Sequence, residues 1–258
     1  MIRHDPEQYW DAKAAASAHD PLGAVCVGDP QRDLCIDRVQ RRLLRLALAR
    51  LDRSAMPARP ALLDMGCGTG RFSQTLTQQG FSYHGIDIAG GMIDIARREH
   101  PHSRFDKFDG QNLPFPDASF DVAMSLAVVH HNTYARQDVL LDELVRVLAP
   151  GGTLLTFEGI APRTTDETGV FFYRPVADWR SALEARGLEL LWQRGARYFA
   201  LEHIGSALAS RAGFRRERVS PTLLKLGAIV DPYLIAARPN RLHDRWFAIW
   251  RKRAAVEA

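Results

Sequence analysis

The segment from Ala61 to Gly70, ALLDMGCGTG, restricts the fold of this chain more than any other feature. A mostly apolar run, 61–65, is followed by three glycines in alternate positions: Gly66, Gly68 and Gly70. Residues 71–79 are compatible with a helix. Because glycine has no Cβ and tolerates positive φ, the backbone of such a turn can come close to a ligand. The segment therefore predicts a strand, a ligand-binding turn and the start of a helix.

Three classes of ligand use a glycine turn of this kind. The phosphate-binding loop of nucleoside triphosphatases needs Lys and Ser or Thr after its last glycine, whereas Arg71 and Phe72 follow Gly70 here. A dinucleotide-binding turn needs a third small residue three positions after its second glycine, and that position is again Arg71. S-adenosylmethionine (SAM) remains, since it has no phosphate and needs room only for its amino-acid part and ribose.

Three carboxylates end or follow apolar runs: Asp64, Asp87 and Asp109. In an open α/β sheet, ligands bind outside the carboxyl ends of the strands, so these residues are expected at one edge. Asp87 comes about 20 residues after the turn, where a ribose-binding carboxylate is expected. Asp64 is placed to accept a hydrogen bond from a cationic amine. A tight turn without a ligand is the alternative, and the three carboxylates disfavour it.

Further motifs follow the glycine turn in order. They are Gly85–Ile88 (GIDI), Met92-Ile93 with Ala96-Arg97, Phe108–Pro116 (FDGQNLPFP), Ser119–Val122 (SFDV), His130-His131 and Leu148–Gly152 (LAPGG). Over about Pro60 to Phe157 the chain therefore resembles the class I SAM-dependent methyltransferases, of the ubiquinone/menaquinone-methylase-like (methyltransferase-11) type. The resemblance implies SAM as the cofactor and S-adenosyl-L-homocysteine as the product.

Strand and helix patterns alternate along this stretch, which predicts a parallel sheet with right-handed crossovers. Strands are expected at 61–65, 82–87, 103–107, 120–126, 153–158 and 188–193, and helices at 70–79, 90–99, 135–148 and 178–186, the last with Gly187 as its C-cap. The resemblance implies a Rossmann-like α/β fold: a seven-stranded sheet with helices on both faces, six strands parallel. The seventh strand, 246–250, is expected antiparallel between the fifth and the sixth.

Three parts are expected along the chain. Residues 1–59 form an N-terminal helical segment packed on the core, with a helix over 37–52, a loop over 21–30 and a short helix at Tyr9-Trp10. These two aromatic residues either close over the cofactor, as the N-terminal segment often does in the resembled family, or simply pack on the sheet. The SAM-binding domain comprises 60–195 and 246–258.

Residues 196–245 separate two strands that the resembled family usually joins by a short hairpin, and an unusually long connection is often functional. We expect a helical cap over the acceptor; a dimer surface or structural padding are the alternatives. Arginines in or near this insert could attract an acidic acceptor or could equally face solvent: Arg197, Arg211, Arg215, Arg216 and Arg218.

The resemblance also assigns contacts to SAM. The methionine end would contact Asp64, Gly66 and Gly68, with Cys67 inside the same loop, and the ribose hydroxyls would donate to Asp87. The adenine would contact Ile88, Met92, Asp109, Gly110 and Gln111, and the sulfonium would lie near Ser125 and Leu126. Met92 could instead be helix core, and Asp109 could also form a turn before Gly110. Cys67 has no identified base partner and is interpreted as a small packing residue, not a nucleophile.

His130 and His131 follow the fourth expected strand, at the rim where an acceptor would reach the methyl group. Histidine can remove a proton near neutral pH, so either is a candidate general base. Structural contacts are the alternative for both. Because neighbouring side chains diverge in extended backbone, at most one is expected to face the pocket. No metal site is expected, since no other ligand lies at a recognisable spacing.

Composition favours a cytoplasmic enzyme. The chain has 258 residues, a net charge of +4 and three cysteines, and we see no apolar signal segment or membrane-spanning stretch. We expect methyl transfer to a small or medium-sized organic acceptor at oxygen, with no nucleic-acid partner. N- or C-methylation, as of a quinone-like ring, and SAM binding without turnover are the alternatives. The oligomeric state stays open, a homodimer included.

Overall fold

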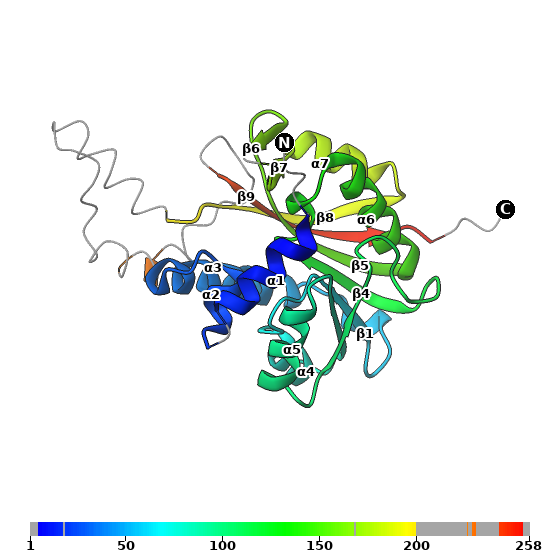
Figure 1. Cartoon of the computed structure of the whole chain (residues 1–258). Helices are drawn as coiled ribbons and strands as arrows, with labels where there is room; N and C mark the ends of the chain where they lie inside the picture. Colours follow the sequence, from blue (N-terminus) through cyan, green and yellow to red (C-terminus); the bar gives the residue numbers. More distant parts are fainter. Residues whose placement is uncertain are drawn as a thin grey trace.

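The protein is built around one seven-stranded sheet with the strand order β3-β2-β1-β4-β5-β9-β8 (Figure 1). The computed structural model describes residues 5–17, 19–167, 169–199, 226, 229–230 and 243–254. The strands are β1 Ala61–Met65, β2 Ser82–Asp87, β3 Arg104–Lys107, β4 Phe120–Leu126, β5 Leu148–Gly159, β8 Leu188–Ala196 and β9 Arg245–Lys252. β9 is antiparallel to its neighbours β5 and β8, and the other strand pairs are parallel. This arrangement confirms the expected Rossmann-like sheet.

Helices cover both faces of the sheet (Figure 1). They are α1 Pro6–Ala16, α2 Pro21–Val25, α3 Pro30–Leu48, α4 Ser73–Gln78, α5 Gly90–Glu99, α6 Tyr134–Val147 and α7 Val176–Glu184, with the short 3₁₀ turns η1 Arg53–Ala55 and η2 Val129–His131. Successive strand residues point to opposite faces. Leu62 accordingly packs in the cluster under α3, α4 and α5, while Leu63 packs in the cluster under α6 and α7.

The three N-terminal helices each begin at an Asp-Pro pair. Asp5, Asp20 and Asp29 accept hydrogen bonds from the backbone N–H groups of the first turn, and a proline follows each of them. An N-cap Asp with proline at the first helical position is a favourable helix start. The predicted loop over 21–30 is therefore wrong, because α2 and the start of α3 occupy it. The helix predicted over 37–52 begins and ends earlier, as α3.

Other differences are local. Helix α4 begins at Ser73, since Gly70 adopts a φ of +73°. Helix α7 has Ala185 as its C-cap, and Gly187 with φ +79° lies two residues further on, so the predicted cap was wrong. Strand β5 is longer than predicted, and a small antiparallel hairpin, β6 Thr165–Glu167 with β7 Phe171–Tyr173, was not predicted.

The predicted cap over 196–245 lies almost wholly outside the described residues, and the division into three parts stays a prediction. The described ends of this stretch are 196–199 and 243–245. Within the part of the chain that the structure describes, no helix is both long and apolar enough to cross a membrane.

Candidate functional site

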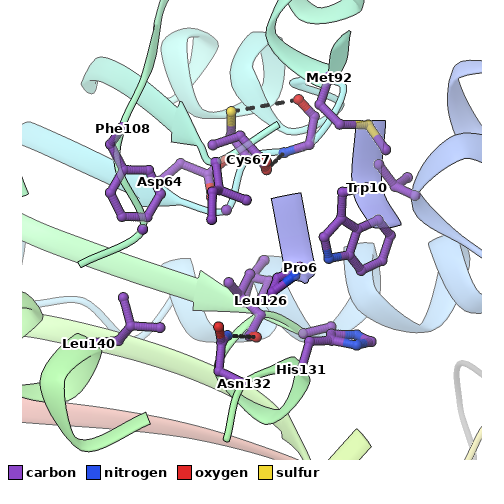
Figure 2. Close-up of a pocket in the computed structure, with 18 of the residues that line it drawn as sticks. Pro6, Trp10, Asp64, Cys67, Met92, Phe108, Leu126, His131, Asn132 and Leu140 are labelled. Carbon is purple, nitrogen blue, oxygen red and sulfur yellow. Dashed lines mark hydrogen bonds between the residues drawn. The ribbon is translucent and has the colours of Figure 1, made fainter. Parts of the chain in front are cut away.

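A pocket opens at the carboxyl ends of β1, β2 and β4, with an empty volume of about 940 Å³ including its open mouth (Figure 2). Volumes of this order are typical of small-molecule sites. The lining residues are Pro6, Trp10, Val25, Gln40, Asp64, Gly66, Cys67, Gly68, Arg71, Phe72, Asp87, Ile88, Met92, Phe108, Gly110, Leu126, Ala127, Val128, His131, Asn132 and Leu140. The glycine turn and two of the three predicted carboxylates therefore meet at one cavity.

The glycine turn needs glycine for conformation and for space. Gly66 and Gly68 have φ values of +74° and +54°, which residues with a Cβ rarely adopt. A Cβ at Gly66 would overlap the Val128 side chain, and one at Gly68 would overlap Val25. The turn is thus pressed between the loop after β4 and the N-terminal helices, with its backbone at the cavity.

Asp87 is held rigidly in the pocket wall. Its Oδ2 accepts a hydrogen bond from the backbone N–H of Gly68 at 2.9 Å, and its Oδ1 accepts one from Ala89 at 3.0 Å. Burial raises the pKa of this carboxyl, although these N–H groups partly offset the effect. Each oxygen keeps a further lone pair, so the side chain can accept two more hydrogen bonds from a ligand.

Asp64 lies deeper, at the end of β1, and is 2% exposed. Its Oδ2 accepts a hydrogen bond from the Tyr83 hydroxyl at 2.8 Å. Burial raises the pKa of Asp64 to about 7, against the opposing effects of Tyr83 and Arg71. A buried carboxylate of this kind is stabilised when a cation comes to it, which suits the ammonium group of an amino-acid ligand.

Most of the predicted cofactor residues line the pocket, and three do not. Asp109 is exposed, and its carboxylate accepts hydrogen bonds from the backbone of Gln111 and Asn112 in its own loop, both at 2.8 Å. Gln111 is exposed beside it. Ser125 is buried and its hydroxyl donates to Glu158 at 3.0 Å. The contacts of these three residues with SAM stay predictions.

The two adjacent histidines lie in different surroundings. His131 lines the pocket, whereas His130 does not. His130 is 2% exposed, and its Nδ1 lies 2.6 Å from Oε2 of the equally buried Glu158. Burial raises the pKa of Glu158 and lowers that of His130, so the pair favours a state without net charge. Only His131 is therefore placed to meet a bound molecule.

Trp10 brings the N-terminal helix to the pocket. Figure 2 shows its indole beside His131, on the side of the pocket opposite Phe108; the Trp10 and His131 ring centroids are 5.1 Å apart, edge to face. Helix α1 is attached to the core by two polar contacts: Asp11 accepts from the backbone N–H of Gly91 at 2.8 Å, and Glu7 pairs with Lys107 at 2.6 Å. Trp10 thus lines the pocket and also packs against the buried cluster that contains Met92 and Ile95, so its closing over the cofactor stays a prediction.

Several lining residues were not predicted as site residues. Arg71 served only to exclude other ligands, yet it lines the pocket, and its guanidinium is ion-paired with Asp37 at 2.6 Å and hydrogen-bonded to Gln40. Phe108 belongs to a quoted motif and could have been inferred from it. Gln40 and Leu140 come from helices whose sequence carries no ligand signal, so only the tertiary structure reveals them.

The residues of the pocket fit SAM. Two carboxylates, Asp64 and Asp87, suit an ammonium group and a pair of hydroxyls. Apolar side chains, Ile88, Met92 and Leu126 among them, suit the faces of a purine. Among the described lining residues the one Lys or Arg is Arg71, already ion-paired, so the cavity is a poor site for a phosphate. No group of three His, Cys, Asp or Glu in the described chain could hold a metal.

Comparison with known sequences agrees with this chemistry. The family described as a methyltransferase domain matches residues 63–156. The chain is 32% identical over 168 residues to a fatty-acid O-methyltransferase of Mycolicibacterium smegmatis, covering 64% of this chain and 56% of that protein. It is 36% identical over 129 residues to a demethylmenaquinone methyltransferase of Streptomyces griseus, covering 49% and 53%. It is 36% identical over 97 residues to a human probable tRNA methyltransferase 9B, covering 37% and 20%.

The chain thus spans about half, or less, of the length of these relatives. Solved structures share the fold. A chain from the complex of the Haloferax volcanii Trm112 methyltransferase activator with a methyltransferase superposes with a TM-score of 0.65 at 18% identity, covering 98% of this chain and all of that one. A SAM-dependent methyltransferase of Methanosarcina mazei gives a TM-score of 0.54 at 17% identity, covering 78% and 96%. Residues 63–156 therefore match a methyltransferase domain, and the described chain has the fold of these solved structures.

Proposed function

We propose that this protein transfers a methyl group from SAM to a small or medium-sized organic acceptor, at oxygen. The observation that carries the proposal is the position of Asp87: a buried carboxylate at the end of β2, hydrogen-bonded to the glycine turn and lining the same cavity as Asp64. A ligand with a vicinal diol and an ammonium group matches this pair. Phosphate-bearing nucleotides do not, since two carboxylates would repel them.

The cofactor would be held by the residues described above. Asp87 accepts from the two ribose hydroxyls, and Asp64 accepts from the ammonium group. Ile88 and Met92 flank the adenine, with the backbone at Gly110 beside it. SAM supplies an electrophilic methyl group on a sulfonium, and its departure as a neutral thioether needs no acid.

The protein's own contribution is then alignment. Holding two reactants in line contributes roughly 7–11 kcal/mol in favourable cases. His131, at the rim of the cavity against Trp10, is the side chain placed to accept a proton from a hydroxyl acceptor. A carboxylate acceptor would need no base. His130 would act only by fixing the turn that presents its neighbour.

The named relatives support oxygen as the target without deciding it. One is named a fatty-acid O-methyltransferase, another a demethylmenaquinone methyltransferase, and a third a probable tRNA methyltransferase. N- or C-methylation, including that of a quinone-like ring, is the second candidate, favoured by the menaquinone relative. A SAM-binding protein without turnover is the third. The odd, low number of cysteines in the sequence supports a cytoplasmic location.

The test is release of S-adenosylhomocysteine from purified protein with SAM and separate acceptor panels: hydroxy acids and fatty acids, phenols and quinols, amines, and unmodified tRNA. Mass spectrometry of the product then identifies the methylated atom. Turnover on an oxygen acceptor supports the proposal. Turnover on amines, ring carbon or tRNA alone would replace it with the second candidate or with RNA methylation. Tight SAM binding with no turnover on any panel would favour the third.

A further inference from the structure

A second polar site lies two strands from the predicted sulfonium position, at Arg245. This residue begins β9, where the strand pairs with Gly159 of β5 and Ala196 of β8, so it stands at the same sheet edge as the pocket. Its side chain is half-buried. The guanidinium lies over the Tyr198 ring, with Cζ 4.7 Å from the centroid, and Nη1 donates to the backbone oxygen of Asp244 at 2.7 Å.

The charge of Arg245 is not held in an ion pair within the described part of the chain. Within the described ranges no Asp or Glu forms an ion pair with it, in contrast to Arg71, Arg146 and Arg174. Burial acts to lower the pKa of Arg245, but Asp244, Tyr198 and Tyr173 more than offset this, and the group stays cationic. A cation withdrawn from water among aromatic rings is stabilised by an anion that reaches it.

One hydrogen bond links this site to a residue of the cofactor pocket. Gln40 lines the pocket, and its Nε2 donates to the hydroxyl of Tyr198, the ring on which Arg245 rests. Gly159, the cross-strand partner of Arg245, leaves the space beside it to the rings of Tyr173 and His130, which a Cβ would strike. Arg245 therefore lies on the strand beside Gly159, whose neighbours are the Tyr173 and His130 rings. The His130 ring in turn contacts the His131 ring at the pocket, with centroids 4.4 Å apart.

We propose that Arg245 binds a carboxylate at the end of the acceptor remote from the methylated atom, an inference that rests on the proposed function. From β4, where the methyl group is expected, to β9 is two strand spacings, roughly 10 Å, so the bound carboxylate and the nucleophile are different groups. The acceptor class is accordingly a hydroxy acid. The fork of a guanidinium fits a carboxylate, and a phosphate dianion would add one more negative charge than a carboxylate beside Asp244.

The test compares matched acids and esters on protein saturated with S-adenosylhomocysteine. The probes are para-hydroxyphenylpropanoate and ω-hydroxyoctanoate, each with its neutral methyl ester, and calorimetry measures their binding. On the wild type, at least one acid should bind ten- to a hundredfold more tightly than its ester, the range for a charged hydrogen-bond pair. Arg245→Gln should abolish that preference. Arg251→Gln, on the exposed opposite end of the same strand, should retain it.

Three results would overturn the inference: an acid preference unchanged in Arg245→Gln, an equal loss in Arg251→Gln, or no acid preference in the wild type. S-adenosylhomocysteine affinity in each variant shows that the fold is intact. Should Arg245→Gln fail to fold, Arg245→Met is the second variant, since it removes the charge and keeps an apolar side chain against the Tyr198 ring. An acid preference unchanged in that variant is the contradicting result. A wild type that does not bind S-adenosylhomocysteine at all would instead refute the proposed function, and this inference with it.

Discussion

Asp64→Asn should make the ligand-free protein more stable and the SAM complex weaker. In the folded chain Asp64 is buried, and burial raises its pKa from the ordinary 3.8 to about 7. Between these two values the folded state binds more protons at this site than the unfolded state. The free energy of unfolding therefore falls as pH rises from about 4 to about 7. Asparagine does not titrate, and its side-chain oxygen can still accept the Tyr83 hydroxyl.

The size of the effect follows from the shift. About three pKa units at 1.36 kcal/mol each correspond to roughly 4 kcal/mol above pH 7, as an upper bound on what ionised Asp64 costs the empty pocket. The variant should be more stable than the wild type at pH 8, and the difference should disappear near pH 4. SAM affinity should change in the opposite direction, falling ten- to a hundredfold with the loss of a charged partner for the ammonium group.

Urea unfolding of both proteins between pH 4 and pH 8, with and without SAM, measures both effects. Asp109→Asn is the matched control, because that carboxylate is exposed and its partners belong to its own loop; it should show no such rise in stability between pH 4 and pH 8. A variant of Asp64 that is destabilised by the same amount at every pH would refute the reasoning. So would an unchanged SAM affinity.

Four further predictions concern the same site. Asp87→Asn should weaken SAM binding ten- to a hundredfold in calorimetry, since a charged hydrogen-bond pair contributes about 1.5–3 kcal/mol; an unchanged dissociation constant in a folded variant would exclude the ribose assignment. Trp10→Ala should speed dissociation of S-adenosylhomocysteine in stopped-flow measurements, whereas Trp10→Phe should not; equal rates in both would mean that the ring does not cover the cofactor. His131→Asn should lower kcat on a hydroxyl acceptor at constant SAM affinity; full turnover in this variant would exclude His131 as the general base. His130→Asn should instead lower the Tm. Replacing 196–245 by a short turn should leave SAM affinity near normal and abolish acceptor turnover. Loss of SAM affinity in a folded variant would mean that the insert closes over the cofactor, whereas full activity would mean that the insert serves assembly or is structural padding.

The core was predictable because its signals are local. The glycine turn, the apolar runs before Asp64 and Asp87 and the helix patterns between them each depend on a few consecutive residues. The structure places strands β1, β2 and β4 at the predicted bounds. The Asp-Pro starts of the N-terminal helices are equally local, and they were missed because prolines and glycines in 21–30 were taken as loop formers. At the first helical position a proline favours a helix.

Contacts between distant segments could not be predicted in this way. Nothing near Trp10 indicates that it reaches His131, and the hairpin that brings Phe171 against the same ring, at 4.8 Å, has no turn signal strong enough to have been noticed. These residues meet because α1 packs on α5 and the hairpin packs on η2. The side of the pocket formed by Trp10, His131 and Phe171, where an acceptor is expected to bind, is therefore the side that could least be predicted from the sequence.

The pairing of strands β4 and β5 explains why one of the two adjacent histidines is buried and the other lines the pocket. Glu158, at the end of β5, accepts hydrogen bonds from the Ser125 hydroxyl and from the backbone N–H groups of Val129 and His130, at 3.0 to 3.3 Å, and its Oε2 lies 2.6 Å from the His130 ring nitrogen. One buried carboxyl thus fixes the end of β4 and the turn that follows it. That fixation draws His130 inward and leaves His131 at the pocket. Since Glu158 lies 28 residues from His130, no local pattern could have separated the two, whereas the pairing of β4 with β5 does so directly.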